Sequence, residues 1–115
     1  MPDFLLPLRE RAAAFAQLPE AELRQALVTE YAPGAGIGWH RDKPMFGEVI
    51  GVSLLSPCNL RFRRAAPDGW ERRSLNPAPR SAYLLQGPAR NEWEHSIPGV
   101  KTQRYSVTFR RYLGD

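Results

Sequence analysis

The sequence predicts a mainly β fold, a jelly roll of eight strands in two facing sheets with one or two short helices at the N-terminus. After residue 27, short stretches of strand character alternate with turn residues, a spacing that is typical of a sandwich or barrel. Before residue 27, apolar residues are spaced as in a helix. The 115 residues, of which 43% are hydrophobic, suit one compact domain.

The N-terminal region, residues 1–26, is rich in Ala, Leu, Glu, Gln and Arg, which favour helix. Its apolar positions keep the helical period from about residue 5 to residue 27. Leu18-Pro19 interrupts this pattern, because proline lacks the amide hydrogen that a helix interior needs. We therefore expect two short helices here, followed by the jelly roll over residues 27–115.

The rest of the chain is interpreted as strands bounded by residues that favour turns. The turns are Pro33-Gly34, Ser56-Pro57, Pro67-Asp68-Gly69, Asn76-Pro77, Gly87-Pro88 and Pro98-Gly99. The expected strands lie near residues 27–31, 36–41, 48–55, 58–64, 70–75, 81–86, 92–96 and 104–112. Two facing sheets can bring an early strand and a late strand together at one edge.

The chain is basic, with 16 Lys and Arg against 12 Asp and Glu, a net charge of +4 and a pI near 9.7. Most of the excess is arginine, at positions 61, 63, 64, 72, 73, 90, 104, 110 and 111. This charge favours an anionic partner such as a phosphate backbone. A soluble protein with a high isoelectric point, and no such partner, explains the charge equally well.

The compartment is predicted from what the sequence lacks. Cys58, the only cysteine, has no partner for an internal disulfide. The sequence shows neither a signal segment nor an apolar run long enough for a bilayer. We expect a cytoplasmic monomer with no membrane partner.

The triplet His40-Arg41-Asp42 has the spacing of two metal ligands. Residues i and i+2 of a strand share a face about 7 Å apart, so His40 and Asp42 can bind one ion while Arg41 points away. One such pair arises by chance in about 7% of chains of this composition, and an isolated pair is more often a surface or turn pair. The triplet alone therefore leaves both interpretations open.

His95 is the candidate for a third ligand. In a strand over residues 92–96 it shares a face with Trp93. Taken alone, it is more often a packed or surface histidine. Two histidines and one carboxylate on one face of a metal, with open positions opposite, form the site of non-haem iron(II) oxygenases. His40, Asp42 and His95 together therefore predict an iron site.

The last strand alternates clearly between two kinds of residue. Arg104, Ser106, Thr108 and Arg110 fall on one face, and Tyr105, Val107 and Phe109 fall on the other. Any half-solvated strand alternates in this way. Beside an iron site, however, the two arginines gain a task, because guanidinium groups bind a dicarboxylate through paired hydrogen bonds.

A kinase is excluded, although His40-Arg41-Asp42-Lys43-Pro44 begins like a kinase catalytic loop. That loop needs an Asn five residues after the Asp to hold magnesium, and here the position is Gly47. The chain is also too short for the second lobe of a kinase.

The chain resembles the AlkB-like 2-oxoglutarate and Fe(II)-dependent dioxygenases from about residue 27 to residue 112. The resemblance is carried by Tyr31-Ala32-Pro33-Gly34-Ala35, His40-Arg41-Asp42-Lys43, Val52-Ser53-Leu54, His95 and Arg104-Tyr105-Ser106-Val107-Thr108-Phe109-Arg110. It implies that the fold is a double-stranded β-helix, in agreement with the predicted jelly roll. It also implies that His40, Asp42 and His95 are the catalytic iron ligands. Tyr31, Arg104 and Arg110 are the implied contacts to 2-oxoglutarate, with Arg104 on the distal carboxylate.

The function implied by the resemblance is oxidative demethylation of alkylated nucleic-acid bases, in DNA or RNA, with O2 and release of succinate, CO2 and formaldehyde. Several aromatic residues are available for stacking on a base, namely Trp39, Trp70, Trp93, Tyr83 and Phe62. Two alternatives stay open. One is the same chemistry on a protein or a small molecule, and the other is an inactive basic module that binds nucleic acid.

Two features depart from the family pattern. Thr29 and Ser106 stand where the best-known members have Asn, so we expect fewer or shorter contacts to the cosubstrate. The front end, about 26 residues, is shorter than in known repair enzymes, so we expect the substrate lid to be largely missing or replaced.

Overall fold

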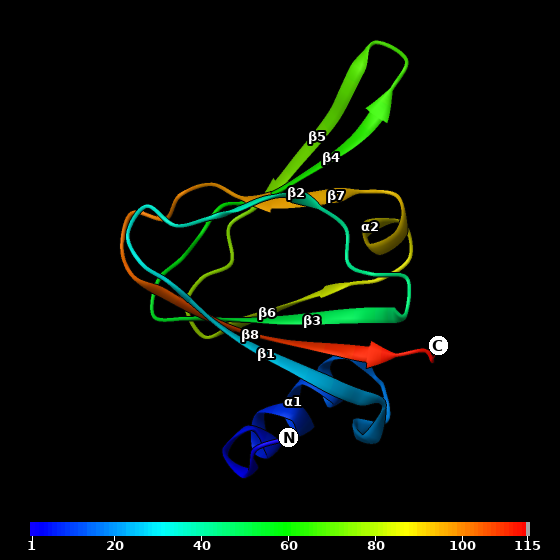
Figure 1. Ribbon diagram of the computed structural model, residues 1–115, viewed down its shortest axis with the longest axis vertical. Coiled ribbons are helices and arrows are strands. Elements are labelled where there is room, and N and C mark those ends of the chain that lie inside the picture. The colour runs from blue at the N-terminus through cyan, green and yellow to red at the C-terminus, as the bar shows by residue number, and fades with distance from the viewer. Residues whose placement is uncertain (115) are drawn as a thin grey trace.

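A computed structural model describes residues 1–114, and its eight strands form two four-stranded antiparallel sheets that face each other (Figure 1). The strand orders are β1-β8-β3-β6 and β2-β7-β4-β5. The strands are β1 (Leu23–Tyr31), β2 (Ile37–His40), β3 (Phe46–Leu54), β4 (Leu60–Ala66), β5 (Gly69–Leu75), β6 (Ser81–Leu85), β7 (Glu94–Ile97) and β8 (Arg104–Tyr112). The chain changes sheet after each strand except β4, which pairs with β5 in a hairpin. The predicted mainly β jelly roll is confirmed.

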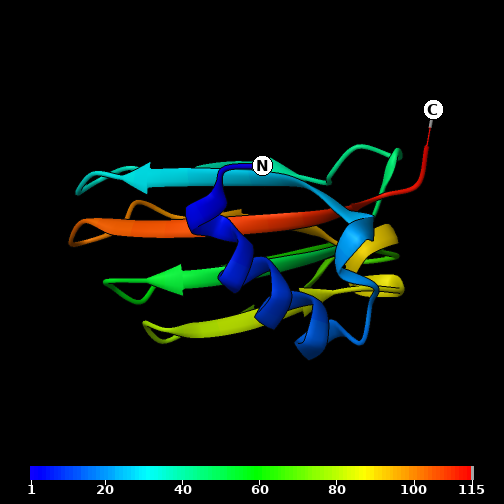
Figure 2. The same cartoon turned by 90° about the horizontal axis from the view of Figure 1, so that it is seen from below.

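The N-terminal helix α1 (Leu6–Ala16) lies across the outer face of the β1-β8-β3-β6 sheet (Figure 2). Single 3₁₀ turns flank it, at Asp3–Leu5 and Glu20–Glu22. The buried Ala12 and Ala13 belong to one apolar core with Val52 and Phe109 of the sheet. Small side chains on this helix let it approach the sheet closely. Within residues 1–114, no helix has the length and apolar character that crossing a bilayer requires.

The prediction of a second helix after Pro19 is wrong, because a single 3₁₀ turn and then β1 follow there. Gln17 takes a left-handed φ of 58° and ends α1, and Pro19 follows before a helix can restart. β1 begins at Leu23, not near residue 27, and Ala26 pairs with Phe109 of β8. Residues 23–26 prefer helix in isolation, but hydrogen bonds and burial against β8 outweigh that weak local preference.

The predicted alternation of β8 is confirmed. Val107 and Phe109 face α1 and are buried in the core between helix and sheet. Arg104, Ser106, Thr108 and Arg110 line the space between the two sheets. The interior of the jelly roll is therefore polar at this strand, whereas its main apolar core lies outside the sandwich, beneath α1.

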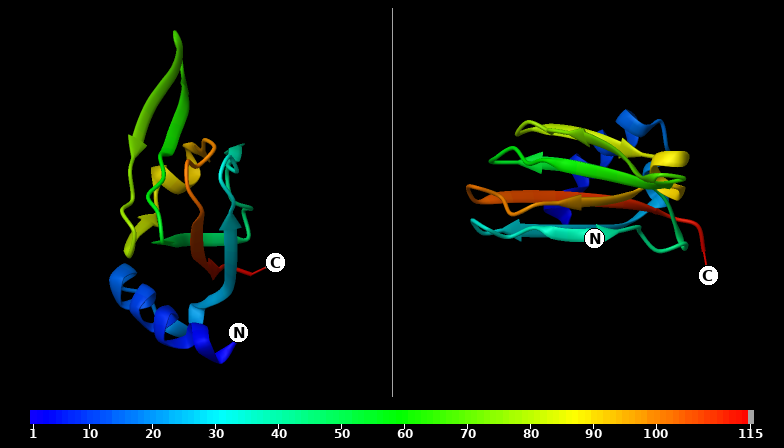
Figure 3. Two further views of the ribbon diagram at one scale, coloured as in Figure 1. Left: turned by 90° about the vertical axis from the view of Figure 1, so that its left-hand side faces the viewer. Right: turned by 90° about the horizontal axis from the view of Figure 1, so that it is seen from above.

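A two-stranded arm projects from the β2-β7-β4-β5 sheet. β7 pairs with β4 only over residues Arg61–Arg63, whereas β4 and β5 stay paired as far as Ala66 and Gly69. The outer part of this hairpin points away from the rest of the fold, at the end opposite α1 (Figures 1 and 3).

A short helix that the sequence did not predict, α2 (Pro88–Asn91), precedes β7. Gly87 has a positive φ of 56°, and Pro88 takes the first helical turn, where its missing amide hydrogen costs nothing. β7 consequently begins at Glu94 and not near residue 92.

Candidate metal centre

The structure brings the three predicted iron ligands together between the sheets. Ligand atoms of His40, Asp42 and His95 all lie within 4.8 Å of one another. The pairing of β2 with β7 sets His40 directly opposite His95, with ring centroids 4.2 Å apart. Asp42 lies just past the end of β2, in the loop that leads to β3. Nitrogen and carboxylate donors at this spacing suit a single transition-metal ion.

The tautomer of His40 is set by a main-chain group. Its Nδ1 lies 2.9 Å from the carbonyl oxygen of Gly38. Because a carbonyl can only accept, Nδ1 carries the proton and donates it. The lone pair is then on Nε2, which is the arrangement that a metal ligand needs.

His95 is held in its neutral form. Burial first, and then the positive charge of a protonated His40, lower its pKa to about 4, although the carboxylate of Asp42 opposes both effects. Phe62 lies beside the ring, with centroids 6.3 Å apart, and provides its aromatic neighbour. A neutral imidazole near pH 7 has a lone pair to offer a metal.

Asp42 has one oxygen in use and one free. Its Oδ1 accepts a hydrogen bond of 3.1 Å from Nη2 of Arg110, whereas Oδ2 is buried and has no hydrogen-bond partner among residues 1–114. A buried carboxylate oxygen without a partner is costly, and a cation beside it removes that cost. The donor set and this free oxygen both fit a divalent metal.

Arg104 is the largest fully buried side chain, at 0% exposure. Its Nε donates to Oγ of Ser53 at 3.1 Å, and its guanidinium lies over the Tyr31 ring at 5.1 Å. Nη1 and Nη2 are buried without a hydrogen-bond partner among the described residues. A buried guanidinium with two parallel free donors matches the two oxygens of a carboxylate.

The two other predicted cosubstrate contacts lie nearby. Tyr31 is 4% exposed, and burial raises the pKa of its hydroxyl, which therefore stays a hydrogen-bond donor at neutral pH. Arg110 forms an ion pair with Asp42 and also donates to Gln25 at 3.0 Å. Arg110 is thus in direct contact with a candidate metal ligand.

All six predicted site residues line one cavity between the sheets, whose free volume is about 50 Å³. Thr29 and Ser106 line it too, and they lie opposite each other in the β1–β8 pairing. Sequence reasoning gave Ser53 no individual role, and it counted Arg90 only among the arginines that favour an anionic partner. Ser53 could have been found, since it is a polar residue on the same side of a strand as its apolar neighbour Val49. Arg90 carried no such signal, because in sequence it resembles any surface arginine.

The sequence of this chain matches a known protein family. Residues 1–110 match the family described as 2OG-Fe(II) oxygenase superfamily. An Arabidopsis thaliana protein named alkylated DNA repair protein ALKBH8 homolog is 30% identical, over 90% of this chain and 36% of its own length. Uncharacterized protein L905 of Acanthamoeba polyphaga mimivirus is 32% identical, over 77% of this chain and 48% of its own. The chain thus spans about a third to a half of these relatives.

Solved structures show the same fold in more than one kind of enzyme. A prolyl-4-hydroxylase from Pseudomonas putida superposes with a TM-score of 0.64 at 19% identity, over 97% of this chain and 65% of that one. A dTDP-4-dehydrorhamnose 3,5-epimerase from Elizabethkingia anophelis superposes with a TM-score of 0.59 at 6% identity, over 93% of this chain and 59% of that one. Because one fold carries different chemistry in these enzymes, the residues of the site and not the fold determine the reaction.

Proposed function

Since the chain belongs to the 2OG-Fe(II) oxygenase superfamily, we propose that it uses Fe(II) and 2-oxoglutarate to demethylate alkylated bases of nucleic acids. Fe(II) and 2-oxoglutarate are the metal and the cosubstrate of this family. The relatives are longer than this chain, so the proposal concerns what its own residues support.

One observation carries the oxygenase part of this proposal. The buried, partly unpaired guanidinium of Arg104 lines the same cavity as the cluster of His40, Asp42 and His95. A metal cluster alone fits many proteins. A second site for an anionic carboxylate beside it fits a metal that works together with a dicarboxylate.

The iron would be held by Nε2 of His40, by Oδ2 of Asp42 and by the imidazole of His95. When bound, iron and 2-oxoglutarate together supply the oxidation of a C–H bond by O2. Each histidine has a lone pair for the metal, because Nδ1 of His40 donates its proton to Gly38 and His95 is neutral. Arg110 orients the Asp42 carboxylate through their ion pair of 3.1 Å.

Arg104 would bind the distal carboxylate of 2-oxoglutarate with Nη1 and Nη2. Tyr31, stacked on the same guanidinium, would donate its hydroxyl to the cosubstrate. The cavity of about 50 Å³ has room for only a few water molecules. Entry of the cosubstrate therefore requires a shift of the lining side chains.

The nucleic-acid part of the proposal is supported by the printed name of the Arabidopsis relative, which refers to alkylated DNA repair. It is supported also by the basic composition of this chain, with its net charge of +4.

The proposed demethylation balances in two steps. One oxygen atom of O2 enters the N-methyl group and the other enters succinate, while 2-oxoglutarate loses CO2. The N-hydroxymethyl group then releases formaldehyde, and the nitrogen regains a proton.

The projecting hairpin is the candidate contact surface for the nucleic acid. Arg63 lies between two indoles, 4.4 Å from the Trp39 ring and 4.2 Å from the Trp70 ring. Trp70 is 47% exposed and can stack on a base. Arg61 donates from Nε to Oγ of Ser96 at 3.2 Å. Neither Arg61 nor Arg72 forms an ion pair with a carboxylate among residues 1–114, so both remain able to contact phosphates.

The other predicted stacking residues are placed differently. Trp93 packs against Arg64, which is neutralised by Glu71 and Glu92. Phe62 and Tyr83 pack against an inner apolar cluster and are less accessible to a base. Of the five, Trp70 and its neighbour Trp39 therefore support the proposal best.

The test is O2-dependent succinate release by the Fe(II)-loaded protein, with single-stranded DNA and RNA that carry N-methylated bases. We expect methylated strands to stimulate release with stoichiometric formaldehyde, unmethylated strands to give none, and Asp42→Ala to abolish both products. Trp70→Ala should weaken strand binding, whereas Phe15→Ala, a 52% exposed aromatic on α1, serves as the matched control.

Each alternative gives a different result. Succinate release that no nucleic acid stimulates favours a protein or a small molecule as substrate. Strand binding with a steep salt dependence and no turnover under any condition favours an inactive binding module. Either result overturns the demethylation proposal, and the second also overturns the oxygenase proposal.

A further inference from the structure

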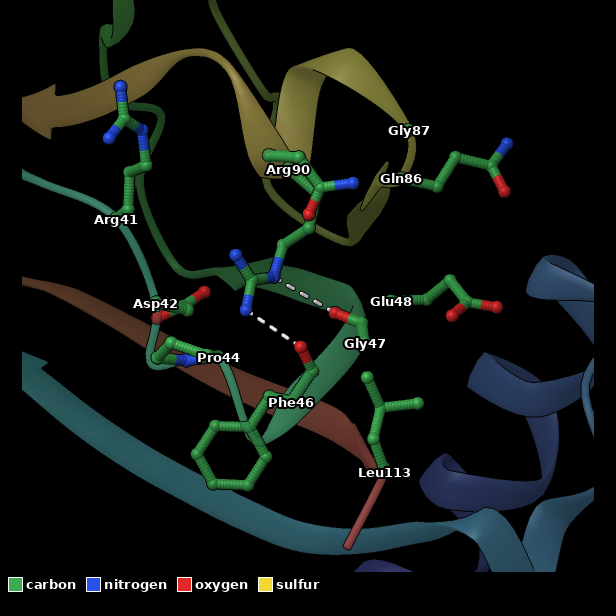
Figure 4. Close-up of a pocket in the computed structure, with 11 residues that line it drawn as sticks. Arg41, Asp42, Pro44, Phe46, Gly47, Glu48, Gln86, Gly87, Arg90 and Leu113 are labelled. Atoms are coloured by element: carbon green, nitrogen blue, oxygen red, sulfur yellow. Dashed lines mark hydrogen bonds between the residues drawn. The ribbon is translucent and has the colours of Figure 1, made fainter. Parts of the chain in front are cut away.

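Arg90 in α2 is buried, at 7% exposure, and its guanidinium reaches a distant loop. Nε donates to the carbonyl oxygen of Gly47 at 3.0 Å. Nη2 donates to the carbonyl oxygens of Lys43 and Phe46, each at 2.7 Å. Figure 4 shows this guanidinium between α2 and the start of β3, with the bonds to Gly47 and Phe46 drawn.

The hydrogen-bond partners of Arg90 are main-chain carbonyls and not carboxylates. Within residues 1–114 it has no ion pair with a carboxylate, whereas Arg110 pairs with Asp42 and Arg111 pairs with Glu22 and Glu48. A buried charge is costly to desolvate unless hydrogen bonds compensate it, and here main-chain carbonyls supply that compensation. The hydrogen bonds of this side chain thus fix the backbone of one loop.

That loop begins just after His40, the last residue of β2, and contains Asp42. Residues 41–45 belong to no strand, and they connect Asp42 to β3. The other main-chain bonds here are from Phe46 to Lys43 and from Leu113 to Met45. The Arg41 side chain adds one bond, from Nη2 to the carbonyl oxygen of Glu92 at 3.2 Å. Arg90, with three bonds to main-chain carbonyls, is therefore the main side-chain support of the backbone just after Asp42.

Arg90 also precedes His95 by five residues, and α2 leads directly into β7. Arg90 therefore ties the segment that carries Asp42 to the segment that carries His95 through three bonds, where Arg41 contributes one. Arg110 orients the Asp42 carboxylate itself, through its bond to Oδ1. The two arginines act at different levels, since Arg110 fixes the side chain and Arg90 fixes the main chain behind it.

We propose that Arg90 is a positioning residue, which sets the distance between the Asp42 carboxylate and the His95 imidazole and thereby the affinity for a divalent metal. This inference rests on the proposed metal site. Arg90 also forms part of the wall of a pocket of about 520 Å³ that includes Asp42 and is seen in Figure 4. Loss of the clamp would therefore loosen the metal site and this pocket together.

The test is Mn(II) binding to the full chain, measured by titration calorimetry, with the visible spectrum of bound Co(II) as a report on coordination. We expect Arg90→Gln to weaken Mn(II) binding by about 10–100-fold, as for other residues that orient ligands, and to alter the Co(II) spectrum. Arg90→Lys keeps the charge with fewer donors, so we expect its affinity for Mn(II) to lie between those of the wild type and Arg90→Gln. Because lysine is the milder change, it also serves if Arg90→Gln does not fold.

The matched control is Arg111→Gln, which likewise removes several hydrogen bonds, to Glu22 and Glu48, but none to the loop after Asp42. We expect it to lower thermal stability without changing Mn(II) affinity. If folded Arg90→Gln or Arg90→Lys binds Mn(II) with wild-type affinity and spectrum, the positioning role is refuted and the metal site stands. If the wild-type chain binds neither ion, the metal site itself fails and this inference falls with it.

Discussion

Ser53 accepts a hydrogen bond of 3.1 Å from Nε of Arg104, and both residues have an exposure of 0%. The bond crosses from β3 to β8 and fixes the plane of the guanidinium, because Nε lies within that plane. Arg104 lines the cavity, and its Nη1 and Nη2 are buried without hydrogen-bond partners among the described residues. The fold thus buries a guanidinium that is only partly hydrogen-bonded, and under the proposed function its two free nitrogens would bind a carboxylate.

Removing this charge is expected to stabilise the chain and to abolish cosubstrate recognition. Arg104→Met keeps the volume of the side chain and removes the desolvation cost, so we expect the free energy of unfolding to rise by about 1–4 kcal/mol. The rise in Tm that 2-oxoglutarate causes in the Mn(II)-loaded wild type is expected to disappear. Thermal unfolding with and without 2-oxoglutarate measures both effects.

A second ligand isolates the role of the distal carboxylate. We expect the wild type to prefer 2-oxoglutarate to 2-oxobutyrate, which lacks that carboxylate, and Arg104→Met to lose the preference. Ser53→Ala keeps the guanidinium but releases its orientation, so it is expected to weaken 2-oxoglutarate binding by only about 0.5–1.5 kcal/mol. A wild-type preference in Arg104→Met would assign the carboxylate to another residue.

Metal removal is expected to destabilise the wild type but not a variant that lacks the free oxygen of Asp42. Asp42→Asn replaces Oδ2 with an amide nitrogen that cannot bind a cation, while Oδ1 can still accept from Arg110. At a Mn(II) concentration 100 times the Kd, the ion stabilises the wild type by about 2.7 kcal/mol, and a chelator removes this gain. Unfolding in urea, with and without chelator, gives the comparison. Equal chelator effects in the two proteins would contradict the assignment of Asp42.

The sequence predicted those features of the site that depend on neighbouring residues, and it missed those that depend on contacts between residues far apart in the chain. The alternation of Arg104 and Arg110 is local to β8 and was predicted correctly. Position 90 is one of the arginines that the charge count assigned to an anionic partner, yet it is buried and bound to main-chain carbonyls. That role depends on contacts across more than 40 residues, which composition and spacing do not contain. The prediction of helix for residues 23–26 was wrong for the same reason, because pairing with β8 determines the conformation of this segment.

Gly51 is expected to tolerate no larger side chain while Tyr83 is present. A Cβ built on Gly51 would overlap the end of the Tyr83 ring, which lies across it from β6. We expect Gly51→Ala to lower the free energy of unfolding by about 1–3 kcal/mol, as overpacking does. In Gly51→Ala/Tyr83→Ala the clash is absent, so a double-mutant cycle in urea is expected to show coupling of about 0.5–3 kcal/mol. Additive effects of the two substitutions would rule out the clash.

Tyr83 is also expected to make stability fall at high pH. Burial raises the pKa of its hydroxyl from 10.0 to about 12, although the positive charge of Arg104 opposes the shift. The folded state thus keeps a proton that the unfolded chain releases above pH 10, so this stabilisation is complete below pH 10 and is lost as the pH rises toward 12. A shift of this size corresponds to about 3 kcal/mol. Tyr83→Phe has no hydroxyl to titrate, so its stability in urea is expected to decline less steeply than that of the wild type over this range. Other titrating groups are shared by the two proteins and cancel in the comparison, so parallel declines would place the Tyr83 hydroxyl in contact with solvent.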